Sequence, residues 1–277
     1  MNSVPVANAR MYSATPSVKA DWNELLAWVL RRAELPWEVI DYDAPAPLSV
    51  LWARDDLGLA MMCGLPFAKR MNERTNGPTR PTLVAAPLPS PARYGGRPVY
   101  FTDIVVRADS PHRTLEDTFG GVVGYTLADS MSGGVALRQH LESFRAARQA
   151  RLYRLAVGDL IHARGVIEAL AAGRIDVGPL DSHYHDLLRH HEPAFAAQVR
   201  SVASTSALPI PPLVATASLS ADVLARLREA LLATAATPAL GPLMERLLLA
   251  GFAVPDAADY LPLAAMAAAG ATPFEEL

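Results

Sequence analysis

The fold is decided by a stretch that runs Val99-Tyr-Phe-Thr-Asp-Ile-Val-Val-Arg107, Gly120-Gly-Val-Val-Gly-Tyr125, Asp129-Ser-Met-Ser-Gly-Gly134 and finally Gly173-Arg-Ile-Asp-Val-Gly-Pro-Leu-Asp-Ser182. The first two pieces are apolar or glycine-rich and predict β-strands. The third is a serine–glycine turn between a strand and a helix, and such a turn exposes backbone N–H groups at the helix N-terminus. Because the helix dipole adds partial positive charge there, the turn predicts a place that can hold an anion.

The same alternation of strands and helices continues on both sides of this stretch. Strands are predicted at 6–12, 37–42, 57–62, 82–87, 99–107, 121–126, 152–156, 175–180 and 199–204, and residues 213–217 follow a proline cluster. Helices are predicted at 18–33, 49–54, 67–74, 114–118, 133–149, 162–172, 181–191, 220–235, 239–250 and 256–269, with a turn at 76–81.

This alternation predicts an α/β fold with parallel sheets and helices on both faces. A single sheet would need more strands than is usual, so two lobes are expected, each a mostly parallel sheet flanked by helices. The strands near 99–107 and 199–206 are the natural crossovers between the lobes. The first lobe is predicted to comprise residues 1–100 plus 205–277, and the second residues 101–204.

Composition excludes several classes of protein. Of the 277 residues, 51% are hydrophobic and 19% are charged, which indicates a globular chain. The net charge is −3, so there is no electrostatic basis for a nucleic-acid partner. No apolar run is long enough to predict a membrane span, and the N-terminus lacks the basic start and apolar core of a signal peptide. The sequence as written therefore predicts a cytoplasmic protein, or a periplasmic one if a signal is missing from it.

The motifs together resemble the phosphate/phosphonate-binding components of ABC transporters, which are type II periplasmic binding proteins. The resemblance covers most of the chain. It rests on the strand and turn quoted above, on Leu208-Pro-Ile-Pro-Pro-Leu-Val214, and on the later pairs Gly251-Phe and Asp259-Tyr. It implies a two-lobe, periplasmic-binding-protein-like fold that closes over an oxyanion in a cleft between the lobes.

Under this resemblance, the serine–glycine turn holds the ligand. The hydroxyls of Ser130 and Ser132 can each donate to an oxyanion oxygen, and the N–H groups of Met131, Ser132, Gly133 and Gly134 can point at the same place. Glycine allows the backbone to come close. Without the resemblance, the same turn favours a simple helix N-cap at Ser130 or Ser132.

Four further positions are implied as ligand contacts, and three of them have an alternative. Tyr100 contacts the ligand or packs in the hinge, and His162 donates to the anion or satisfies a carbonyl at its helix start. Asp181 suits an amino group on the ligand, or it is a helix N-cap. Phe67 stands where the family can have a tyrosine, so a hydroxyl donor is lost. Pro211 stands where the family can place an aspartate for a ligand ammonium, which makes a zwitterionic aminoalkylphosphonate less favoured than another ligand.

The histidine-rich segment 181–191 invites a metal interpretation. On a helix, His183, Asp186 and His190 share a face with the spacing of metal ligands. We nevertheless interpret the segment as a surface helix with solvent-exposed histidines, and we predict no metal site and no cofactor.

The function predicted from the sequence is a solute-binding protein that captures a small oxyanion or organic anion, with an ABC-transporter permease as candidate partner. The alternative is a cytoplasmic enzyme or ligand sensor on the same fold, dehydratase-like or pyrimidine-synthesis-like. The sequence shows no nucleophile–base pair, and the only acids that we would place at the edge of the cleft are Asp103, Asp129 and Asp181. No catalytic residue is therefore predicted.

Overall fold

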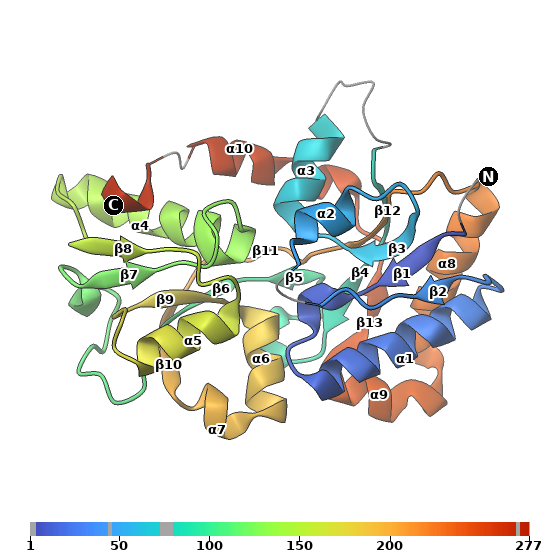
Figure 1. Ribbon diagram of the computed structural model, residues 1–277, viewed down its shortest axis with the longest axis horizontal. Helices are drawn as coiled ribbons and strands as arrows, with labels where there is room; N and C mark the ends of the chain where they lie inside the picture. Colours follow the sequence, from blue (N-terminus) through green and yellow to red (C-terminus); the bar gives the residue numbers. More distant parts are fainter. Residues whose placement is uncertain (1–3, 44–45, 73–79, 270–271, 277) are drawn as a thin grey trace. The chain divides into compact units, whose positions relative to one another are not determined.

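The computed structural model describes residues 4–43, 46–72, 80–269 and 272–276 (Figure 1). The chain divides into two compact units, Met1–Val99 with Pro209–Leu261, and Tyr100–Leu208 with Pro262–Leu277. The boundary at 99/100 differs by one residue from the predicted boundary at 100/101, and the boundary at 208/209 differs by four residues from the one predicted at 204/205. Most of the predicted turn at 76–81 lies outside the described residues.

The first unit contains a six-stranded sheet in the order β13-β4-β12-β3-β1-β2. Its strands are β1 (Val6–Asn8), β2 (Glu38–Val39), β3 (Leu57–Met61), β4 (Thr82–Pro89), β12 (Leu213–Ala215) and β13 (Leu249–Ala253). Strand β1 pairs in parallel with β2 and β3, whereas β12 and β13 are antiparallel to their neighbours. The prediction of a mostly parallel sheet is therefore wrong for this unit: the sheet is mixed, because the chain enters β12 directly from the second unit, without the crossover helix that joins parallel strands.

The helices of the first unit begin near where the sequence predicts them. They are α1 (Pro16–Arg32), α2 (Leu48–Trp52), α3 (Gly64–Asn72), α8 (Ala221–Ala233) and α9 (Gly241–Arg246), with short helical turns at η1 (Arg10–Tyr12), η2 (Ala92–Tyr94), η5 (Thr234–Ala236), η6 (Pro238–Leu240) and η7 (Ala257–Tyr260). The Thr15 hydroxyl caps α1 by accepting from the Val18 N–H at 3.1 Å. Trp22, Leu25 and Val29 on the apolar face of α1 are all 0% exposed.

The second unit is built around β6, which lies between β9 and β10 and is antiparallel to both. Strands β7 and β8 form a parallel pair, and a parallel bridge between Val123 and Val177 joins β7 to the β9 segment. The strands are β6 (Thr102–Arg107), β7 (Val122–Gly124), β8 (Leu155–Val157), β9 (Gly178–Asp181) and β10 (Val199–Ser204). The resulting order is β8-β7-β9-β6-β10.

The helices of the second unit cover both faces of this sheet, with α4 and α5 on opposite sides (Figure 1). They are η3 (Glu116–Thr118), η4 (Met131–Val135), α4 (Ala136–Arg148), α5 (Ala163–Ala171), α6 (Ser182–His191), α7 (Pro193–Ala196), α10 (Pro262–Ala269) and η8 (Phe274–Glu276). Two short strands, β5 (Val99–Tyr100) and β11 (Leu208–Pro209), pair with each other where the chain passes from one unit to the other.

The tail differs from the prediction in two ways. Residues 262–277 belong to the second unit rather than to the first lobe, because Phe274 lies in the apolar core with Ile104 and Leu137 and stacks on Tyr125 at 4.0 Å between ring centroids. The end of the predicted helix at 239–250 is instead the start of β13, because pairing with β4 overrides local helix propensity there. In the described part of the chain, no helix has both the length and the apolar character needed to cross a membrane.

Candidate functional site

Three helices of the second unit begin at one edge of its sheet. Strands β7, β8 and β9 run parallel, and each is followed by a helix, η4 with α4, α5 and α6 respectively. Because the carboxyl ends of parallel strands share an edge, the three capping residues Ser130, His162 and Asp181 gather there. Three of the segments predicted to hold the ligand are thus brought to the same edge of one unit.

The serine–glycine turn forms one turn of π-helix that continues into α4. The Ser130 hydroxyl oxygen accepts from the Gly133 N–H at 3.3 Å, and the Ser130 carbonyl accepts from the Val135 N–H at 2.9 Å. Ser130 is therefore an N-cap, as the turn alone favours, while its own hydroxyl proton remains able to bond an additional acceptor.

The turn has more backbone donors than internal acceptors. Ser130 takes up the Gly133 N–H, but among the described residues nothing outside the helix accepts the N–H groups of Met131 and Ser132. These are the first N–H groups of a helix, which have no partner within the helix. Buried backbone donors are almost always satisfied, so this turn is suited to an external acceptor.

The glycines of the turn are required by packing within the unit. A Cβ on Gly133 would lie 1.8 Å from the Thr126 hydroxyl, and one on Gly134 would lie 2.4 Å from the Leu127 carbonyl oxygen. The Thr126 N–H also donates to the Gly133 carbonyl at 3.0 Å. Because Gly133 and Gly134 have no side chain, the turn can pack against the loop that follows β7. The sequence predicted a close approach of the backbone to a ligand and did not predict this packing role.

His162 caps α5 with its side chain. Its Nδ1 accepts from the Gly165 N–H at 3.1 Å, so the imidazole bonds a backbone N–H rather than a carbonyl. An accepting Nδ1 carries no proton, which places the proton of the neutral ring on Nε2. Since His162 is exposed, Nε2–H is a further donor at this edge of the sheet.

Asp181 caps α6 by the same principle. Its Oδ1 accepts from the N–H groups of His183 at 3.0 Å and Tyr184 at 3.1 Å. The carboxylate therefore occupies the N-terminus of α6, and those two donors are not available to a ligand anion. Of the two roles expected for Asp181, a partner for a ligand amino group or a helix N-cap, the geometry is that of the N-cap.

The two predicted aromatic contacts are buried. Tyr100 on β5 is 1% exposed, and Phe67 on α3 is 0% exposed. The Phe67 ring packs edge-on against Tyr260, with 5.2 Å between centroids. Phe67 is thus part of the core of the first unit. The cleft expected between the lobes stays a prediction.

The interpretation of segment 181–191 as a surface helix with exposed histidines is wrong. His183 and His185 are 0% exposed and Asp186 is 9% exposed, because α6 packs against β6 and β9. Only His190 among these ligand candidates is exposed. No cluster of three or more histidine, cysteine or acidic side chains in the described part of the chain is arranged to hold a metal ion.

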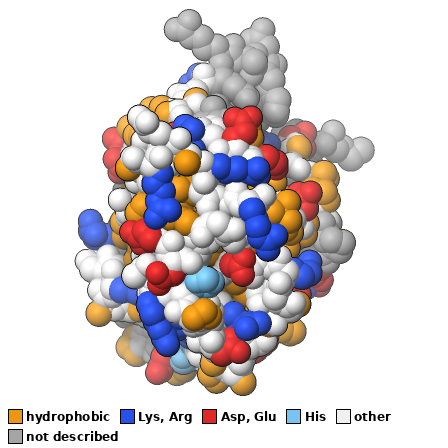
Figure 2. Space-filling model, turned by 90° about the vertical axis from the view of Figure 1, so that its left-hand side faces the viewer, with side chains coloured by type: hydrophobic (Ala, Val, Ile, Leu, Met, Phe, Trp, Pro, Cys, Tyr) orange, Lys and Arg blue, Asp and Glu red, His pale blue; other side chains and the backbone are white. Residues whose placement is uncertain are grey.

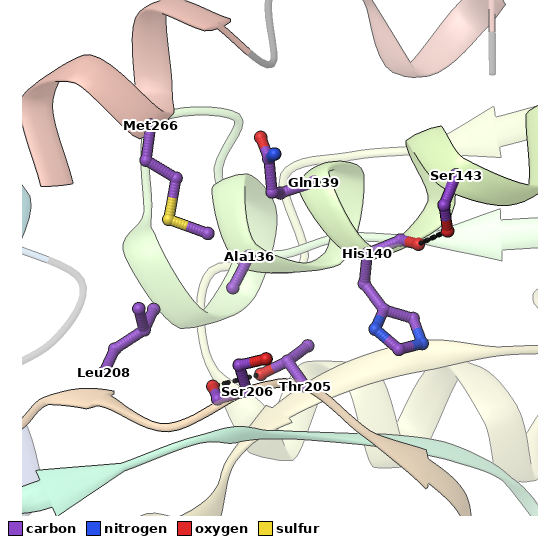
Figure 3. Close-up of a pocket in the computed structure, with 8 residues that line it drawn as sticks. All are labelled: Ala136, Gln139, His140, Ser143, Thr205, Ser206, Leu208 and Met266. Carbon is purple, nitrogen blue, oxygen red and sulfur yellow. Dashed lines mark hydrogen bonds between the residues drawn. The ribbon is translucent and has the colours of Figure 1, made fainter. Parts of the chain in front are cut away.

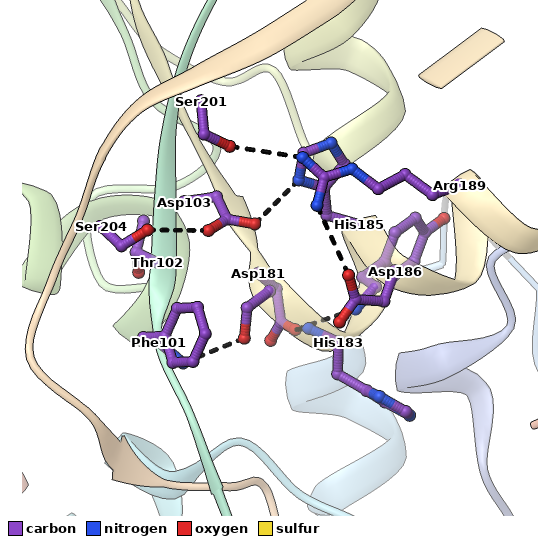
Figure 4. A network of polar contacts seen from close by, with 12 residues as sticks. Phe101, Thr102, Asp103, Asp181, His183, His185, Asp186, Arg189, Ser201 and Ser204 are labelled. Atoms are coloured by element: carbon purple, nitrogen blue, oxygen red, sulfur yellow. Dashed lines mark hydrogen bonds and ion pairs between the residues drawn. The ribbon is translucent and has the colours of Figure 1, made fainter. Parts of the chain in front are cut away.

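A buried network that sequence analysis missed lies next to this helix (Figure 4). The Asp103 carboxylate, 1% exposed, contacts Nδ1 of His185 at 2.9 Å through Oδ2 and accepts from the Ser204 hydroxyl at 3.0 Å through Oδ1. Asp103 was expected as an acid at the edge of the cleft, but it faces the inside of the second unit. The signal for this was an acidic residue within an otherwise apolar strand.

A cavity of about 220 Å³ lies elsewhere in the second unit, between α4, residues 205–208 and α10 (Figure 3). It is lined by Ala136, Gln139, His140, Ser143, Thr205, Ser206, Leu208 and Met266. None of these described lining residues carries a permanent charge. Burial lowers the pKa of His140, which favours the neutral form of its imidazole. The cavity is therefore a poor match for an anion, and the turn remains the candidate site.

Surface charge is mixed where it can be seen. On the described part of the face in Figure 2, basic and acidic side chains alternate and form no continuous field of one sign. An interspersed pattern of this kind is not the electrostatic footprint of a nucleic-acid-binding face.

A family model described as "ABC transporter, phosphonate, periplasmic substrate-binding protein" matches residues 12–260. No curated protein matches the sequence.

Several solved structures share the fold. A binding protein component of a phosphonate ABC transporter from Pseudomonas aeruginosa is 17% identical, with a TM-score of 0.76 over 97% of this chain and 87% of that chain. PhnD1 from Prochlorococcus marinus, in complex with methylphosphonate, is 12% identical, with a TM-score of 0.77 over 97% and 98%. A Xanthomonas citri protein bound to ATP is 22% identical, with a TM-score of 0.63 over 97% and 98%. The predicted α/β fold of the periplasmic binding proteins is confirmed.

Proposed function

Because the chain belongs to the family of periplasmic substrate-binding proteins of phosphonate ABC transporters, we propose that it binds a small phosphonate at the serine–glycine turn and delivers it to a permease. The observation that carries the site is the pair of N–H groups on Met131 and Ser132, which no described residue outside the helix accepts. A tetrahedral oxyanion has enough acceptor oxygens to satisfy both of them at once.

The proposed site combines three kinds of donor. The backbone N–H groups of the turn form the positive end of a helix that runs without a break from Met131 to Arg148. The hydroxyls of Ser130 and Ser132 add charge-assisted hydrogen bonds, which are shorter and stronger than bonds between neutral groups. The exposed Nε2–H of His162 lies at the same sheet edge and completes the set.

The ligand is proposed to be an alkylphosphonate rather than an aminoalkylphosphonate. A ligand ammonium needs an acidic partner, and Pro211 stands where the family can supply one. The carboxylate of Asp181 already accepts two backbone N–H groups. Among structures with this fold, PhnD1 was solved with methylphosphonate, which has no amino group.

The proposed role is transport in the periplasm. The matched family consists of periplasmic substrate-binding components, which supports both this location and a permease as the partner. The enzyme alternative gains no support from two of the three acids that were expected at the cleft edge, since both have structural roles. Asp103 bonds inside the second unit and Asp181 caps a helix.

Isothermal titration calorimetry of the purified protein tests this function. Methylphosphonate is compared with phosphate, phosphite, 2-aminoethylphosphonate and sulfate. We expect saturable one-to-one binding of methylphosphonate and weaker binding of 2-aminoethylphosphonate. In a separate unfolding measurement, methylphosphonate at 100 times its dissociation constant should stabilise the protein by about 2.7 kcal/mol. Absence of binding by every phosphonate would remove the proposed ligand class. Tighter binding of the aminoalkyl compound would contradict the argument from Pro211.

A further inference from the structure

The start of β6 contacts two of the three helix N-termini at the candidate site. Side chains alternate between the faces of a strand, so Thr102 and Asp103 point to opposite sides. We propose that both are positioning residues: Thr102 holds the serine–glycine turn, and Asp103 holds the N-terminus of α6. This inference rests on the proposed function, because it concerns the same oxyanion site.

Thr102 joins the turn to the sheet. Its side chain is buried, and its hydroxyl donates to the Ser132 carbonyl at 2.9 Å. The backbone of Thr102 is itself held by two bonds to one residue, since its N–H donates to the Thr205 hydroxyl at 3.0 Å and its carbonyl accepts from the Thr205 N–H at 3.0 Å. The hydroxyl therefore connects a fixed strand to Ser132, the residue whose N–H and hydroxyl are proposed to bind the ligand.

Asp103 acts on the other face. Through the buried contact with His185 it ties β6 to α6, and through the bond from Ser204 it ties β6 to β10. Phe101, which precedes β6, and Ser182, the first residue of α6, reinforce this connection. The Phe101 N–H donates to the Ser182 hydroxyl at 3.0 Å, and the Phe101 carbonyl accepts from the Ser182 N–H at 2.9 Å. The first turn of α6 is thereby held at more than one point.

The two anchors also relate the two helix starts to each other. Asp181, the cap of α6, is the strand partner of Thr102 in the β6–β9 pairing. The same Thr102 bonds the turn that begins α4, so a displacement of this one residue moves both helix starts. Binding sites need their donors held to within about 0.5 Å, and a strand between two bonded neighbours is a rigid support for that.

The first unit offers a control for the loss of such a hydroxyl. Thr234 is 2% exposed, and its hydroxyl donates to the Leu231 carbonyl at 2.7 Å. Replacing Thr102 or Thr234 by valine therefore removes one buried hydroxyl-to-carbonyl bond in either unit. Only the first substitution releases the turn.

The experiment combines amide hydrogen exchange of the unliganded protein with titration of methylphosphonate. Thr102→Val is expected to accelerate exchange in segment 131–135 and to weaken binding about tenfold, whereas Thr234→Val changes neither, although both lower the melting temperature. Thr102→Ser, which keeps the hydroxyl, is expected to restore slow exchange and wild-type affinity. If Thr102→Val does not fold, Thr102→Ala carries the same comparison.

Asp103 is tested with Asp103→Asn and the matched variant Asp21→Asn, since Asp21 is also buried and pairs with Arg246 in the first unit. Faster exchange in segment 182–185 and weaker binding are expected for the first variant only. Unchanged exchange and unchanged affinity in Thr102→Val and Asp103→Asn would overturn the inference. If the wild type binds no phosphonate, the proposed function fails, while the exchange rates still decide whether these residues hold the two helix starts.

Discussion

Ser132 provides a sharp test of the candidate site, because its hydroxyl has no hydrogen-bond partner among the described residues, whereas that of Ser130 caps the helix. Ser132→Ala should therefore change the free energy of unfolding by less than about 0.5 kcal/mol. If the hydroxyl donates to a ligand oxyanion, its loss should weaken binding by about 1.5–3 kcal/mol, or roughly 10- to 150-fold. Isothermal titration with methylphosphonate and denaturant unfolding of the same preparation measure the two effects separately.

Two further variants complete this test. Ser130→Ala should lower stability by about 1 kcal/mol through loss of the cap, and it should also weaken binding. Ser220 caps α8 in the first unit by accepting from the Val223 N–H at 3.2 Å, so Ser220→Ala should show the stability loss alone. The reasoning is refuted if Ser132→Ala binds methylphosphonate as tightly as the wild type.

Three other predictions concern stability. Gly133→Ala should destabilise the protein by about 1–3 kcal/mol in urea unfolding, because its Cβ would lie 1.8 Å from the Thr126 hydroxyl. Gly241→Ala should not destabilise it, because no atom lies within 4 Å of a Cβ at that position. Equal effects of the two substitutions would contradict the packing argument. Phe274→Ala should cost about 3–5 kcal/mol, since the ring is 2% exposed in the core of the second unit, and a loss below 1 kcal/mol would place the tail outside that core. Burial lowers the pKa of His140 below its ordinary 6.5 in the folded protein, so the unfolded chain binds more protons as the pH falls through 6.5. Stability should therefore decline below that pH and do so less in His140→Gln; identical pH profiles from thermal unfolding would refute this.

Local patterns determined much of what the sequence could predict. The apolar spacing of Trp22, Leu25 and Val29 specified the buried face of α1, and the sequence around Ser130 specified a helix start. Such features depend on residues within one or two turns of each other. The order of the motifs along the chain also identified the family, because several short motifs in one order are more specific than any of them alone.

Tertiary structure decided the features that depend on distant residues. Leu249 to Ala253 have the composition of a helix end, but pairing with β4 makes them a strand. Phe274 belongs to the second unit because Tyr125 and the core around Ile104 accept its ring. No local rule could have predicted either contact.

The candidate site divides in the same way. The sequence by itself determined that Ser130, His162 and Asp181 stand at helix starts, because capping is a local property of the chain. Only the sheet order β8-β7-β9 brought these starts to one edge, and only packing turned Asp103 inward to His185. The reason is physical: a hydrogen bond to a neighbouring N–H is encoded within a few residues, whereas the burial of a side chain is set by whichever distant strand or helix comes to cover it.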